Sequence, residues 1–161
     1  MAEVEIINIM WEGPLTLKAA YEKNDESRDY GVYQVYGDHP VYGLDVLFYI
    51  GETTGTFGER LNNHEQDFEN WEQKIEVCLG RISIPITEEK LKQEKLKQVE
   101  KLLILACWPA LNCQGIKGSS SVEEVKDLLI LNWGRFRSLP GAVSGRQAGI
   151  GDLDVSPKSI T

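Results

Sequence analysis

The sequence is poor in cysteine and has none at the short spacing that metal ligands use. Its three cysteines, Cys78, Cys107 and Cys113, are odd in number and form no C-x-x-C pair. Disulfide scaffolds and structural zinc sites both need paired cysteines, so neither class of protein is supported. We interpret the three residues as free thiols.

Long apolar runs and a targeting signal are also missing. The apolar run Leu102–Cys107 is far shorter than the roughly 20 residues that a transmembrane helix needs. The segment Met1–Met10 carries Glu3 and Glu5 where a signal peptide would be basic. With 161 residues, 42% of them apolar, the chain can bury one core. We therefore expect a single-domain cytoplasmic protein that does not contact membranes.

Positive charge is scarce overall, which alone argues against a nucleic-acid partner, but it is unevenly distributed. The net charge is −8, with −11 in residues 1–80 and +3 in residues 81–161. Because phosphates are neutralised by Lys and Arg, contacts with an anion should come mainly from the second half. There, Arg135, Arg137 and Arg146 lie in a Gly- and Ser-containing stretch without carboxylates. Two interpretations stay open, a nucleic-acid-binding loop and a solvated tail.

Local patterns predict strands in the first half of the chain. Val32–Tyr36 and Val46–Ile50 are rich in β-branched and aromatic residues, and Glu76–Ile84 alternates until Pro85 stops it. Residues 3–10 also favour a strand, and residues 14–23 a short helix of weak periodicity. These patterns predict at least three strands.

Helix-start signals predict three further helices. Thr56 and Glu59 form a capping box that would open a helix from Phe57 to Trp71. A long helix should run from Thr87 to Cys107, where Trp108-Pro109 ends it. A second capping box, Ser121 to Glu124, predicts a helix reaching about Trp133. No domain boundary or internal repeat interrupts this layout.

Six polar residues in these elements could assemble a site that cleaves phosphodiesters. Tyr33 ends the tripeptide Gly-Val-Tyr, and Tyr49 begins Tyr-Ile-Gly. Arg60 and His64 are four residues apart, which places them on one helix face. The other two are Glu100, at the edge of the apolar stripe of its helix, and Asn112, twelve residues later. Taken singly, each has a better structural interpretation, as a sheet aromatic, a surface charge or a turn former.

Taken together, the six positions and their spacing resemble the GIY-YIG nuclease family. The resemblance covers roughly residues 29–112, and it departs at Glu52, where many members have Lys. It implies an α+β fold with a small, mainly antiparallel, three-stranded sheet flanked by helices. We therefore expect an N-terminal extension over 1–28, a nuclease domain over 29–133 and a C-terminal tail over 134–161.

The resemblance also implies metal-dependent hydrolysis and a role for each residue. Glu100 would hold one divalent cation, Mg²⁺ or Mn²⁺. Tyr33 would accept a proton from the attacking water, which needs a pKa lowered by positive charge such as Arg60. Arg60 could instead contact the phosphate. His64 could relay the proton, Tyr49 would hydrogen-bond within the cluster, and Asn112 would brace the site.

Two functions of different classes follow from these expectations. The first is a stand-alone endonuclease acting on nucleic acid, expected to be DNA, with duplex cleavage favouring a homodimer. The flanks carry no zinc, helix-turn-helix or coiled-coil signature. The alternative is a non-catalytic module that keeps the fold and binds nucleic acid or a protein. The acidic first half favours this alternative, and the intact set of six residues favours the nuclease.

Overall fold

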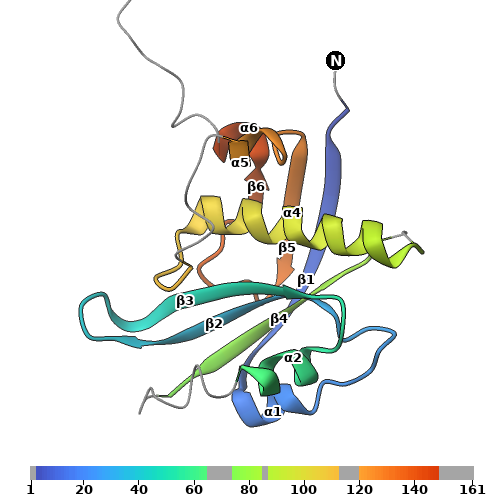
Figure 1. Cartoon of the computed structure of the whole chain (residues 1–161). Helices are drawn as coiled ribbons and strands as arrows, with labels where there is room; N and C mark the ends of the chain where they lie inside the picture. Colours follow the sequence, from blue (N-terminus) through green and yellow to red (C-terminus); the bar gives the residue numbers. More distant parts are fainter. Residues whose placement is uncertain (1–2, 65–73, 85–86, 113–119, 149–161) are drawn as a thin grey trace, which may run out of the picture.

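The computed structural model describes residues 3–64, 74–84, 87–112 and 120–148. Its six strands form one curled sheet in the order β3-β2-β4-β1-β5-β6 (Figure 1). Four neighbouring pairs are antiparallel, and β1 and β5 are parallel. The strands are β1 (Glu5–Thr16), β2 (Gly31–His39), β3 (Gly43–Thr53), β4 (Glu76–Ile82), β5 (Leu128–Gly134) and β6 (Ala142–Ser144).

One long helix and four short ones accompany the sheet in the described part of the chain. They are α1 (Leu17–Tyr21), α2 (Phe57–Asn63), α4 (Glu89–Cys107), α5 (Ser120–Glu123) and α6 (Gly145–Ala148). The long helix ends at Cys107, as predicted, because Trp108 adopts a left-handed backbone conformation with φ 49° before Pro109. Helix α2 ends at Asn63 with His64 as its C-cap, and residues 65–71 of its predicted extent lie outside the described ranges.

The prediction of a three-stranded, mainly antiparallel sheet is wrong, because the sheet is six-stranded and mixed. Strands β2, β3 and β4 are the three that local patterns predicted, and they lie next to one another at one side of the sheet. The residues from 5 onward form the long strand β1, which joins these three strands to β5 and β6. Part of the predicted N-terminal extension is therefore central to the sheet.

The predicted helix over residues 121–133 is the second error. Only the four-residue helix α5, which already begins at Ser120, forms at the predicted start, and Leu128–Gly134 is strand β5 instead. Burial in β5 alternates, with Leu128, Ile130 and Asn132 buried and the residues between them half-exposed. An apolar run of this length fits a helix or a strand equally well, so pairing with β1 decides it.

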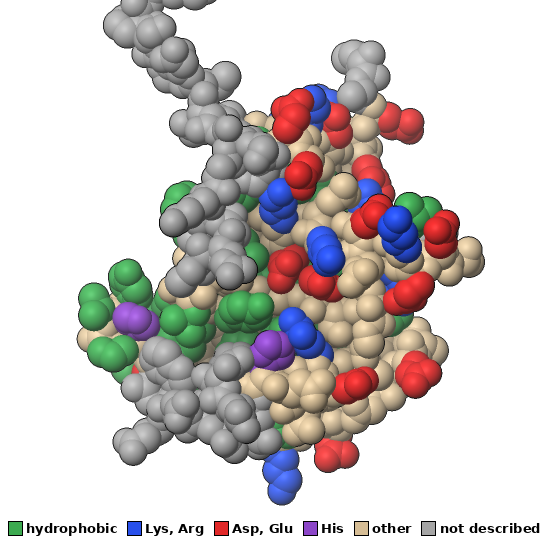
Figure 2. All heavy atoms as spheres, in the orientation of Figure 1, with side chains coloured by type: hydrophobic (Ala, Val, Ile, Leu, Met, Phe, Trp, Pro, Cys, Tyr) green, Lys and Arg blue, Asp and Glu red, His purple; other side chains and the backbone are tan. Residues whose placement is uncertain are grey.

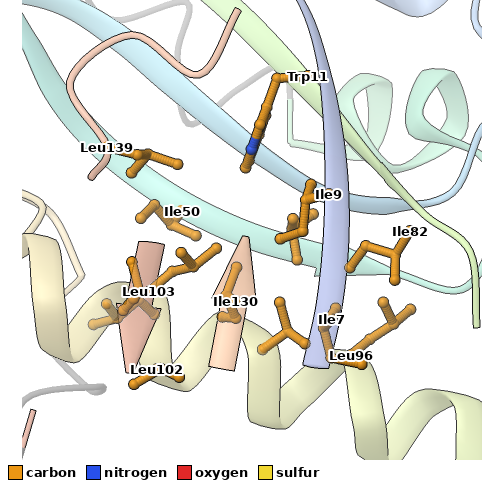
Figure 3. Packing of buried hydrophobic residues seen from close by; sticks show 14 of the residues in the cluster. Ile7, Ile9, Trp11, Ile50, Ile82, Leu96, Leu102, Leu103, Ile130 and Leu139 are labelled. Carbon is orange, nitrogen blue, oxygen red and sulfur yellow. The ribbon is translucent and has the colours of Figure 1, made fainter. Parts of the chain in front are cut away.

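Two cores lie on opposite faces of the sheet. Helix α4 covers one face, where Leu96, Val99, Leu102 and Leu103 share a core with residues of all six strands (Figure 3). On the other face, helices α1 and α2 pack over β2, β3 and β4 through a smaller cluster that includes Tyr33. The β2–β3 pair is thus held from both sides, by α4 and by α2.

Among the described residues, no helix combines the length and the apolar character that a membrane span requires.

Candidate active site

The two tyrosines come together because of the register between β2 and β3. Tyr33 pairs with Gly51, and Val35 pairs with Tyr49, so both phenols lie on the α2 side of the sheet. Their ring centroids are 6.1 Å apart at an interplanar angle of 37°. Tyr33 is 1% exposed and Tyr49 is half-buried. The first phenol is therefore fixed in the core, whereas the second lies nearer the surface.

Helix α2 brings Arg60 to the Tyr33 hydroxyl. The start of the helix is fixed, since the Thr56 hydroxyl accepts from the Glu59 amide at 3.3 Å, as the capping box predicts. The Phe57 amide also donates to the carbonyl of Asp29 at 2.7 Å, just before β2 begins. In this position the Arg60 guanidinium donates a hydrogen bond to the Tyr33 hydroxyl.

One nitrogen of the Arg60 guanidinium donates no hydrogen bond to the described residues. This nitrogen is Nε, which is buried. A buried N–H that finds no partner costs free energy, and such groups in native proteins call for an explanation.

The electrostatics of Tyr33 differ from what a general base requires. Burial raises the pKa of Tyr33 above its ordinary value, and Tyr49 adds to the effect, while Arg60 opposes it without reversing it. The expectation that Arg60 lowers this pKa below its usual range is therefore wrong for the protein without ligands. Tyr33 keeps its proton at neutral pH, so its hydroxyl can donate a hydrogen bond.

Glu100 faces the same region from helix α4. It is half-buried, and its carboxylate accepts a hydrogen bond from the backbone amide of Glu52 on β3. Burial, with repulsion by the Glu52 carboxylate next, raises the pKa of Glu100 to about 7, although Arg60 and Lys97 attract the charged form. The carboxylate predicted to hold a metal ion is thus coupled to Arg60 and, more weakly, to Tyr33.

Asn112 braces the strand that carries Tyr49. Its buried side-chain amide accepts from the backbone N–H of Ile50 and donates to the carbonyl of Ile50, both at 2.9 Å. The preceding residue Leu111 also donates its amide to the carbonyl of Phe48 at 2.7 Å. The chain leaving α4 is therefore attached to β3, and the attachment links the Glu100 helix to the tyrosine strand.

We expect Asn112→Ala to destabilise the fold by about 2–4 kcal/mol, because two buried backbone groups of Ile50 would lose their partners. Urea denaturation followed by circular dichroism measures this loss. Asn62→Ala, at an exposed position of α2, is the control and should change stability by less than about 0.5 kcal/mol. Equal stability of the two variants would contradict the bracing role.

His64 ends helix α2 one turn after Arg60. Its backbone amide donates to the carbonyl of Leu61 at 3.1 Å, and the residue is half-buried. In Figure 2, acidic, basic and histidine side chains gather over the region of α2, β3 and α4. Four of the six predicted residues are thus joined by contacts or electrostatic interactions, namely Tyr33, Tyr49, Arg60 and Glu100. Asn112 bonds the backbone of Ile50, next to Tyr49, and His64 follows Arg60 by four residues.

The three arginines near the C-terminus do not lie together in a free loop. Arg137 forms ion pairs with Asp45 and Glu76 and lies 4.0 Å from the centroid of the Tyr36 ring. Arg146 pairs with Asp127 at 2.9 Å, and Arg135 is exposed. The predicted tail also contributes strand β6, which pairs with β5, to the sheet. Nucleic-acid binding by these arginines stays a prediction.

Two residues of the site were missed as candidates in the sequence. Glu52 follows the Tyr-Ile-Gly tripeptide directly, and Lys97 precedes Glu100 by three residues on α4. Both interact electrostatically with Glu100. The helical spacing could have indicated Lys97, whereas Glu52 comes near Glu100 only through the packing of α4 on β3.

Comparison with protein-family models, with curated proteins and with solved structures gives no match.

Proposed function

We propose that this protein is a divalent-metal-dependent endonuclease that hydrolyses phosphodiester bonds of nucleic acid, with DNA as the substrate. The observation that carries the proposal is that Arg60 of α2 donates to Tyr33 of β2 and interacts electrostatically with Glu100 of α4. A phenol, a guanidinium with an unpartnered buried Nε and a carboxylate are suited to a phosphate and a hard cation. Since each site cuts one strand, duplex cleavage supports a homodimer.

The residues present fit a magnesium-like ion. Within the described ranges, no three His, Cys, Asp or Glu side chains lie close enough together to hold a metal ion. This disfavours a transition-metal site with several side-chain ligands in that part of the chain. Magnesium suits a site with one or two carboxylates, because it keeps several waters and takes phosphate oxygens as further ligands. Glu100 would hold the ion through its half-buried carboxylate. When bound, the ion polarises the scissile phosphate and stabilises charge on the leaving oxygen.

The other residues bind and orient the substrate. Arg60 binds a non-bridging phosphate oxygen, where its charge stabilises the negative charge that builds up in the transition state. The protonated Tyr33 hydroxyl is buried, so it acts through Arg60, whose guanidinium donates to it and is thereby oriented for the phosphate. Tyr49 lies beside Tyr33, Asn112 fixes β3 through the backbone of Ile50, and His64, four residues after Arg60, would accept a proton.

The test is a cleavage assay on supercoiled plasmid with Mg²⁺ or Mn²⁺, repeated in EDTA. We expect nicked or linear product only with metal, and a loss of about 10²–10³-fold for Arg60→Ala, as is typical when a transition-state donor is removed. Lys90→Ala, an exposed cation at the start of α4, is the charge-matched control and should cleave like the wild type.

Two outcomes would contradict this proposal. Cleavage that persists equally in Arg60→Ala would point to a contaminating nuclease. No cleavage of any DNA or RNA by the wild type, together with equal DNA binding by both variants, would favour the non-catalytic binding module instead.

A further inference from the structure

Glu52 lies next to Glu100 although the two residues belong to different elements. Its backbone amide donates to the Glu100 carboxylate, so position 52 of β3 lies against helix α4. On β3, Glu52 pairs with Val32, whose side chain is buried on the α4 side of the sheet. The Glu52 side chain therefore extends toward the helix that carries Glu100.

Both carboxylates are half-buried, so neither is fully solvated. The basic groups that face them are Arg60 from α2 and Lys97 from α4. Arg60 already donates to Tyr33, and Lys97 is exposed. Among the described side chains, none forms an ion pair or a hydrogen bond with the Glu52 carboxylate. Two such carboxylates held side by side have the donor set and charge that a hard divalent cation prefers.

We propose that Glu52 supplies a second carboxylate to the cation that Glu100 holds, an inference that rests on the proposed function. A divalent cation between the two carboxylates would attract both of them and so offset their mutual repulsion. The Glu52 amide has a separate effect, since it orients the Glu100 carboxylate whatever residue occupies position 52. A side-chain variant at position 52 therefore tests the second ligand while leaving that backbone contact in place.

The experiment is a titration of the metal-free protein with Mn²⁺ alone, followed by electron paramagnetic resonance of the free ion. We expect one site in the wild type, loss of that site in Glu100→Gln, and affinity about 10–100-fold weaker in Glu52→Gln. Glu52→Asp keeps the carboxylate and should bind more tightly than Glu52→Gln. Glu59→Gln, an exposed carboxylate on α2, should match the wild type.

A second measurement separates ligand loss from misfolding. In EDTA, Glu52→Gln should melt no lower than the wild type, because it removes a like charge beside Glu100. If Glu52→Gln does not fold, Glu52→Asp and Glu52→Ser take its place in the titration, and the carboxylate variant should again bind more tightly.

The outcomes distinguish this inference from the proposed function. Wild-type affinity in Glu52→Gln, with the site lost in Glu100→Gln, would overturn the role of Glu52 and leave the nuclease proposal standing. Absence of any Mn²⁺ site in the wild type would also overturn it. Glu52-dependent binding in a protein that cleaves no nucleic acid would support the shared ion and refute the nuclease.

Discussion

Glu100→Gln is expected to reduce plasmid cleavage by about 10³-fold, because it removes the carboxylate that would hold the divalent cation. A loss of this size corresponds to about 4 kcal/mol, within the several kcal/mol that a metal ion contributes to stabilising transition-state charge. The amide side chain has the same size and can still accept the hydrogen bond from the Glu52 backbone. The variant should therefore fold like the wild type but lose metal-dependent cleavage.

The same substitution should change how stability depends on pH in the absence of metal. Burial and Glu52 raise the pKa of Glu100 from 4.5 to about 7, so the folded protein binds the proton more tightly than the unfolded chain. This contribution to stability is full below pH 4.5 and is lost as the pH rises through 7. At pH 8 the wild type should lose up to about 3 kcal/mol from this group, whereas the neutral Gln loses nothing.

Melting temperatures in EDTA across this pH range, measured beside the cleavage assay, check both effects. The control is Glu94→Gln, an exposed carboxylate on the same helix, which should cleave and melt like the wild type. A Glu100→Gln protein that still cleaves with metal would exclude Glu100 as the ligand. One that loses cleavage and melts much lower would show only a structural role.

Local sequence patterns predicted the part of the fold that depends on local contacts. Strands β2, β3 and β4 and helix α4 follow from β-branched runs, alternation and a Trp-Pro stop. The Thr56 cap of helix α2 is likewise a short-range feature, whereas His64 lies just beyond the helix as its C-cap. Because the candidate site is built mainly on these elements, most of its residues could be named from the sequence.

Long-range pairing decided what the sequence did not predict. Strand β5 joins the sheet by parallel pairing with β1, in which Glu5 lies opposite Leu128. Nothing in the Leu-rich stretch itself distinguishes that strand from a helix. Charge patterns in the sequence also miss long-range contacts. The segment around Arg137 has no carboxylate and suggested an unpaired cation, but Asp45 and Glu76 from distant strands form ion pairs with this arginine. Glu52 was overlooked because its neighbour Glu100 is distant in the chain.

Gly51→Ala is expected to damage both the fold and the site, since the position opposite Tyr33 leaves no room for a side chain. A Cβ there would lie 2.4 Å from Cζ and 2.5 Å from the hydroxyl of Tyr33, and 2.7 Å from Cε1 of Tyr49. The Tyr33 ring is 1% exposed, so it cannot move aside without disturbing the core. Overpacking of this kind costs typically about 1–3 kcal/mol. Displacing the hydroxyl from Arg60 should also reduce cleavage by about 10²-fold, as misplacement of about 1 Å can.

The matched control is Gly55→Ala in the loop between β3 and α2, where the nearest atom to a new Cβ is 3.6 Å away. Urea denaturation and the plasmid assay, applied to both variants, separate the two effects. We expect Gly55→Ala to stay within about 0.5 kcal/mol of the wild type and to cleave normally. If Gly51→Ala loses stability but keeps full cleavage, the Tyr33 hydroxyl does not need its place beside Arg60. The phenol would then be a core residue, and the site would consist of Arg60 and Glu100 without it.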